Sequence, residues 1–119
     1  MHHTTIQRIR PQLQWSDAVI HAGTAYFVEV PENGEDINSQ TREVLAQAEQ
    51  TLALCHSDKS LIVMATIYLK HMHERTAFNA IWQDWLPDGC APARVCVSAE
   101  MANPLYLLEI AFTAAVIPS

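Results

Sequence analysis

The run LIVMATIYL, at residues 61–69, constrains the fold more than any other stretch of this chain. It is apolar almost throughout and rich in β-branched residues, and polar segments border it on both sides, HSDKS before it and KHMHE after it. Runs of this length and composition are typical of strands that are buried on both faces in the middle of a sheet. We therefore expect a sheet with residues 61–69 in its interior.

Two amphipathic helices are predicted on either side of this strand. The first covers about residues 39–55, and Asp36, Asn38 and Ser39 are its candidate N-caps. The second covers residues 74–86 and ends at Pro87 and Gly89. In each helix the apolar residues fall on one face, as expected for a helix that packs on a sheet. The apolar residues of the first are Val44, Leu45, Ala48, Leu52 and Cys55, and those of the second are Phe78, Ile81, Trp82, Trp85 and Leu86.

Four further segments read as strands. TTIQRIR comes first, and WSDAVIHAGTAYFVEVP predicts a hairpin with its turn at HAG. ARVCVSA and residues 105–116 follow the second helix. The order β-β-β-α-β-α-β-β predicts a single α+β domain over residues 1–119, with both helices on one face of a mixed sheet. The other face is also apolar, so we expect it to pack against other subunits.

Composition excludes several classes of protein. The net charge is −6 with only seven Lys and Arg, so we expect no nucleic-acid partner. No apolar run approaches the roughly twenty residues that span a bilayer, and we expect no membrane partner. The three cysteines fit no zinc pattern and cannot all pair, which points to a reducing cytoplasm. His71 and His73 have no third ligand nearby, and there is no phosphate loop, so we expect neither metal nor cofactor.

Arg94 is the most informative polar residue. It lies in the apolar strand APARVCV, and a guanidinium cannot lose its proton, so it must reach water, a carboxylate or a ligand. Cys96 leaves the same face of the strand, two residues on. Glu109 lies on the last strand, which we expect beside this one. Three alternatives stay open for Arg94: an exposed position, a pair with Glu109, or a ligand carboxylate.

Six segments occur in the order and spacing of one known family. They are WSDAVIHAGTAYFVEVPEN, QTREVLAQAEQTL, ATIYL, FNAIW, APARVCV and LEIAFTAAV. Together they make the chain resemble the Rid (YjgF-type) superfamily over about residues 15–116, and most of all its YoaB-like members. The resemblance implies a chorismate-mutase-like fold that forms a homotrimer through the sheet face opposite the helices, with clefts between subunits.

The resemblance also implies an activity and a site. The best-known members hydrolyse enamines and imines such as 2-aminoacrylate to a 2-oxo acid and ammonia. By position in the motifs, Arg94 would hold the substrate carboxylate, while Cys96, Asn79 and Trp15 would line the pocket. Glu109 is the candidate catalytic carboxylate. This predicts a deaminase of the 2-iminobutanoate/2-iminopropanoate type.

Two departures from the family pattern keep a second function open. Deaminating members carry a Ser-Gly pair where we align Phe27 and Val28, and a second acid where this chain has Ala111. Glu100 is another acid that could serve. The alternative is therefore a non-catalytic binding or regulatory protein that uses the same cleft for a small carboxylate. Ribonuclease activity, attached to some relatives, is disfavoured by the acidic charge.

Overall fold

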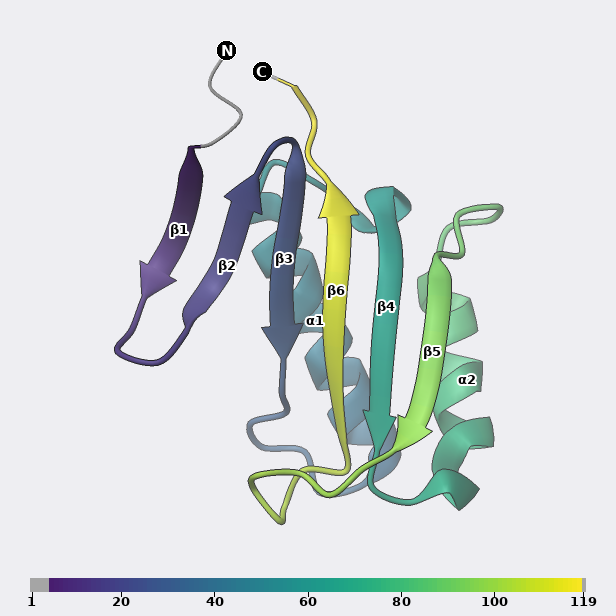
Figure 1. The fold of residues 1–119 in the computed structure, drawn as a ribbon. Helices are drawn as coiled ribbons and strands as arrows, with labels where there is room; N and C mark the ends of the chain where they lie inside the picture. Colours follow the sequence, from purple (N-terminus) through teal and green to yellow (C-terminus); the bar gives the residue numbers. More distant parts are fainter. Residues whose placement is uncertain (1–4, 119) are drawn as a thin grey trace.

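The computed structural model describes residues 5–118 as one six-stranded sheet with two helices behind it (Figure 1). The element order matches the predicted one, and the α+β fold with both helices on one sheet face is confirmed. No helix in this part of the chain is long and apolar enough to cross a membrane. The elements are β1 (Ile6–Pro11), β2 (Ser16–His21), β3 (Thr24–Glu29), α1 (Ile37–Leu54), β4 (Ile62–Leu69), α2 (Arg75–Trp85), β5 (Ala93–Ser98) and β6 (Leu108–Ala115), with short 3-10 turns at Lys59–Leu61 and Met72–Glu74.

The strand order is β1-β2-β3-β6-β4-β5. Only β4 and β5 are parallel, because helix α2 carries the chain from one to the other in a crossover connection. The last strand, β6, lies between β3 and β4, so our expectation that it neighbours β5 was wrong. The crossover places β5 on the outer side of β4, and β6 must pair on the inner side. As predicted, β4 is an interior strand.

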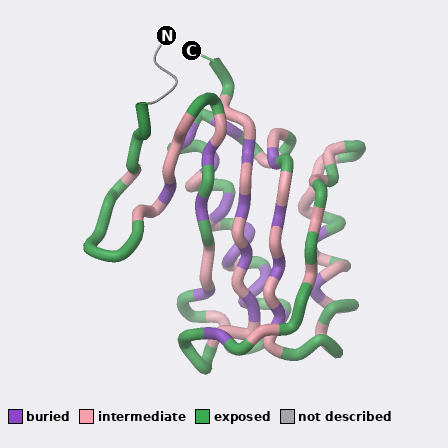
Figure 2. Tube along the Cα trace, viewed as in Figure 1, coloured by how far each residue is buried: buried purple, intermediate pink, exposed green. Residues whose placement is uncertain are grey.

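The core lies between the sheet and the two helices. Every second residue of β6 is buried on that side, and the ring of Phe112 stacks on Phe27 of β3 with centroids 5.0 Å apart. Fully burying such a side chain stabilises the fold by about 1.5–3 kcal/mol. On the other face, Thr66 and Tyr68 of β4 are only half-buried, so within one chain β4 is fully covered on one face and not on both (Figure 2).

Helix α1 begins where one of the predicted caps stands. The Asp36 carboxylate accepts a hydrogen bond from the Ser39 N–H at 2.8 Å, and the Ser39 hydroxyl accepts one from the Asp36 N–H at 3.1 Å. This capping box satisfies two N–H groups that the helix leaves free. One turn later, the Glu43 carboxylate accepts from the N–H groups of residues 32, 33 and 34 at 2.9, 2.9 and 3.1 Å. Helix α1 thereby fixes the loop that follows β3.

The β1–β2 ribbon separates from the rest of the sheet at one end. Strand β2 pairs with β3 only through Thr24, Ala25 and Tyr26, and the two strands diverge beyond that point (Figure 1). The far end of β3, up to Glu29, therefore pairs with β6 on one side and leaves its other edge open. We call this wedge between β2 and the end of β3 the fork.

Candidate functional site

A cavity of about 940 Å³ occupies the fork. The ribbon, the end of β3, the second half of α1 and the start of β6 all contribute to its wall. The residues on which the argument depends are Trp15, Asp17, Val28, Glu29, Thr51 and Glu109. Trp15 is 63% exposed, which is unusual for an indole and leaves one wall of the cavity aromatic and uncovered.

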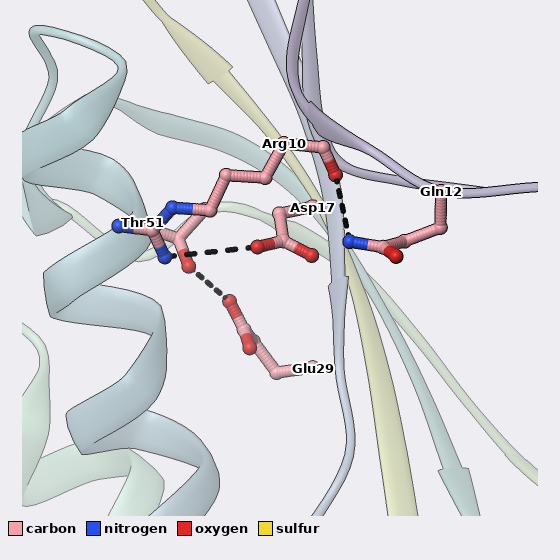
Figure 3. Close-up of polar contacts among 5 residues, drawn as sticks. All are labelled: Arg10, Gln12, Asp17, Glu29 and Thr51. Atoms are coloured by element: carbon pink, nitrogen blue, oxygen red, sulfur yellow. Dashed lines mark hydrogen bonds and ion pairs between the residues drawn. The ribbon is translucent and has the colours of Figure 1, made fainter.

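Glu29 is the most perturbed acid at the fork. It is half-buried at the end of β3, and the Thr51 hydroxyl of α1 donates a 2.6 Å hydrogen bond to its Oε2 (Figure 3). Burial raises the pKa of the Glu29 carboxyl from its ordinary value near 4.5 to about 7. The Thr51 hydrogen bond lowers the pKa in part, whereas the negative charges of Asp17 and Glu32 raise it. At neutral pH Glu29 is thus poised between its two protonation states.

The fork carries more negative than positive groups. Among residues 5–118, Arg10 is the only cationic residue that lines the cavity, and its Nη1 lies 3.7 Å from Oδ2 of Asp17 (Figure 3). The Arg10 side chain is 63% exposed, so this ion pair contributes little to stability. Glu29, by contrast, is hydrogen-bonded to a neutral hydroxyl.

We expect Glu29→Gln to change the pH dependence of stability. Between about pH 4.5 and pH 7 the unfolded chain loses a proton that folded Glu29 keeps, so the parent's free energy of unfolding falls as the pH rises. The variant should equal the parent near pH 4 and exceed it by about 1–2 kcal/mol near pH 8.5, a figure reduced for solvent screening. Urea unfolding at both pH values measures this, with exposed Glu35→Gln as control. The same difference at both pH values would contradict the expectation.

A second group of candidate residues lies at the other edge of the sheet. As predicted, the side chains of Arg94 and Cys96 lie on the same face of β5. This is the helix face, because the two residues align with the buried Ala65 and Ile67 of β4. The Arg94 guanidinium lies 5.7 Å from the ring centroid of Phe78 on α2, within the range of a cation–π interaction. Among residues 5–118 no carboxylate lies within ion-pair distance of it. The next residue on α2, Asn79, buries its Oδ1 without a hydrogen-bond partner from the described residues.

Glu109 does not pair with Arg94. It aligns with Tyr68 on the face of the sheet that carries no helix, whereas Arg94 is on the helix face. Strand β4 also separates the two strands. The paired alternative is therefore excluded within one chain, which leaves water or a ligand carboxylate as the acceptor for the half-buried guanidinium.

The candidate site residues thus form two groups within the chain. Trp15 and Glu109 line the fork, and Arg94, Cys96 and Asn79 belong to the β5 edge. Three strand spacings, roughly 14 Å, separate β5 from β3. The two groups cannot meet around one small molecule inside a single chain.

The sequence was compared with families and curated proteins. A family model described as Endoribonuclease L-PSP matches residues 5–116. The RutC family protein YoaB of Escherichia coli is 43% identical over 113 residues, which cover 94% of this chain and 99% of that protein. The chain belongs to the Rid (YjgF-type) superfamily. The resemblance to its YoaB-like members is confirmed.

Solved structures of the Rid superfamily share the fold. A YjgF-family protein from Neisseria meningitidis superposes with a TM-score of 0.96 at 39% identity, covering 99% of this chain and all of that one. A protein of the Rid family from Yersinia pestis gives a TM-score of 0.88 at 25% identity, covering 94% of this chain and 100% of that one.

The structure locates the positions at which this Rid chain departs from the family pattern. Phe27 is 4% exposed and belongs to the core, whereas Val28 is 52% exposed and lines the cavity. Ala111 aligns with Val28 on the uncovered face. Glu100 is exposed and does not line the cavity. Sequence reasoning missed Glu29, although a lone carboxylate in the apolar strand TAYFVEV is a signal that could have found it.

Proposed function

We propose that this protein is a cytoplasmic homotrimer that binds small 2-oxo, imino or enamine carboxylates in clefts between its subunits and hydrolyses the imines among them. The observation that carries the proposal is Arg94, a half-buried guanidinium without a carboxylate partner among the described residues, at the sheet edge opposite the fork. The N–H donors of the Arg94 guanidinium are spaced so that two of them can bind the two oxygens of one carboxylate. The contact with Phe78 restricts where those donors point.

A cleft between subunits would unite the two groups of residues. If the β5 edge of one chain packs against the fork of the next, each contact joins two different surfaces, and repeating it closes a ring. The sheet face without helices supports the same assembly, because it exposes apolar side chains that a ring would bury. These include Tyr26, Val95 and Val97, which are 46%, 41% and 39% exposed.

In this proposal the protein catalyses the reaction mainly by holding the substrate and the attacking water in the right positions. Arg94 holds the carboxylate, Cys96 and Asn79 line its side of the cleft, and Trp15 of the next subunit forms the facing wall. Glu109 lies beside the reacting carbon as the catalytic carboxylate. Water adds to the imine carbon, the carbon–nitrogen bond breaks, and a 2-oxo acid and ammonia leave. Fixed geometry supplies much of the rate in reactions of this kind.

The second candidate function is a non-catalytic binding or regulatory protein with the same cleft. Ala111 favours it, because a methyl group stands where deaminating relatives carry an acid that handles the water. Turnover of 2-aminoacrylate by the parent protein separates the two functions. The family model's description as an endoribonuclease does not change this choice, since a chain with a charge of −6 lacks the basic surface that RNA requires.

Light scattering tests the assembly. We expect three subunits per particle in dilute buffer, and we expect Tyr26→Glu to dissociate them, because it places a charge on the buried sheet face. The control is Met72→Glu, a substitution of an apolar residue of similar exposure that lies in a 3-10 turn away from that face. A monomeric parent, or equal effects of the two substitutions, would contradict the proposed ring.

A further inference from the structure

We infer that Glu29 is a second acid–base residue of the cleft and transfers the protons of imine hydrolysis that the residue at position 111 cannot handle in this chain. The inference rests on the proposed function and assigns a role that the family's motif residues do not contain. Glu29 would act together with Glu109, which lines the same cavity.

The position of Glu29 at the open end of β3 brings it to the cavity. Glu29 aligns with Ile110, the residue between Glu109 and Ala111, and aligned residues of antiparallel strands have Cα atoms about 4.5–5.5 Å apart. Ile110 is buried in the core, so the Glu29 side chain leaves β3 on the helix face, whereas the side chains of Glu109 and Ala111 are on the other face of the sheet. Glu29 and Glu109 nevertheless line one cavity, which includes residues of both faces at the end of β3. Strand β2 pairs with β3 only as far as Tyr26, so no neighbouring strand covers the outer edge of β3 beside Glu29.

Glu29 is held by one oxygen and free at the other. Oε2 accepts the Thr51 hydroxyl hydrogen bond, and within residues 5–118 no hydrogen bond is made to Oε1. The nearby cation, Arg10, pairs with Asp17 and not with Glu29. The free oxygen leaves Glu29 one position from which to exchange a proton with a molecule in the cavity.

Burial and the groups around Glu29 together bring the pKa of its carboxyl close to 7. Burial and the carboxylates of Asp17 and Glu32 favour its protonated form, and the hydrogen bond from Thr51 opposes them. Arg10 and Glu109 line the same cavity, and the thiol of Cys55, the C-cap residue of α1, interacts electrostatically with Glu29. The outcome is a pKa of about 7, and proton transfer is most effective when the pKa of the group lies near the working pH.

The proton transfers balance in two steps. As the oxygen of water bonds to the carbon of the protonated imine, ionised Glu29 takes one proton from that water, which leaves a neutral carbinolamine. Glu29 then returns the proton to the amino nitrogen. The carbon–nitrogen bond breaks, the hydroxyl oxygen forms the carbonyl, and the released ammonia takes the hydroxyl proton as ammonium. Glu29 ends ionised, as it began.

The test compares Glu29→Gln with the parent on freshly generated 2-aminoacrylate from pH 5 to pH 9. We expect kcat to fall about 10²–10⁴-fold, and an inflection of the parent's pH profile near pH 7 to disappear. Binding of 2-oxobutanoate, measured by calorimetry, should stay within a factor of a few. The exposed Glu35→Gln should match the parent in kcat and in pH profile.

Thr51→Val provides a readout that a structural role would not produce. It removes the hydroxyl that favours the ionised form of Glu29, so the inflection should move to higher pH while the maximal kcat is kept. This variant also keeps the inference testable should Glu29→Gln fold poorly.

The possible failures can be told apart. If the parent turns over 2-aminoacrylate and Glu29→Gln does so with the same kcat and pH profile, Glu29 has no catalytic role and the proposed function stands. If the parent binds 2-oxobutanoate without turnover, the role of Glu29 is overturned in favour of the non-catalytic binding protein. If the parent does not bind 2-oxobutanoate at all, the proposed function fails together with the inference.

Discussion

Arg94→Ala should weaken the binding of 2-oxobutanoate by at least tenfold and leave the fold almost unchanged. Charge-assisted hydrogen bonds contribute about 1.5–3 kcal/mol each, which corresponds to roughly 10–150-fold in affinity. Within the described residues Arg94 has no carboxylate partner that its removal would leave unpaired. The stabilising contact that it loses is the one with Phe78, about 0.5–1 kcal/mol for a cation–π interaction.

Calorimetry and thermal unfolding of the same samples measure both parts of this prediction. The matched control is Arg75→Ala, which removes an equal charge from an exposed position at the start of α2. It should bind 2-oxobutanoate like the parent. A loss of about 3–5 kcal/mol in stability with unchanged binding would mean that Arg94 serves a buried ion pair instead, for example with a carboxylate of another subunit.

The sequence predicted the elements of the fold well, because local signals determine them. The apolar run at 61–69 gave the interior strand β4, and Asp36, one of three candidate caps, begins α1. The position of β6 was missed, because a short loop between two strands suggests that they are neighbours. Strand β6 lies on the other side of β4 because β5 pairs in parallel with one edge of β4. That parallel pairing depends on long-range packing, which cannot be predicted from any single segment of the sequence.

The site was predicted in part for the same reason. The alternation along a strand correctly placed Arg94 and Cys96 on one face. It could not show that Glu109 lies on the opposite face, because that requires the register of β6 against β4. Glu29 escaped notice because its properties come from the burial that raises its pKa and from Thr51, which is 22 residues away in the sequence. Residues whose orientation or pKa is set by contacts with another strand or helix cannot be recognised from the sequence around them.

The separation of the two groups of residues leads to the second prediction, which concerns mixed particles. In a closed ring each cleft takes Arg94 from one chain and the fork from the next. Arg94→Ala should disable every cleft of a homotrimer. Trp15→Asp should do the same from the fork side, because it places a carboxylate where the anionic ligand would lie. A chain with one defect and a chain with the other can nevertheless form an intact cleft together.

Ligand binding by such mixed trimers is the most direct test of the cleft between subunits. Equal amounts of the Arg94→Ala and Trp15→Asp chains, one of them tagged, are dissociated, reassembled and purified through the tag, and 2-oxobutanoate binding is measured by calorimetry. Each mixed trimer has one cleft of three that joins an intact Arg94 to an intact fork, and the tag also retains homotrimers of the tagged chain. With random assembly, binding should therefore return to roughly one quarter to one third of the parent's capacity. If each site lay within a single chain, every site would keep its defect, and the mixed particles would bind no 2-oxobutanoate.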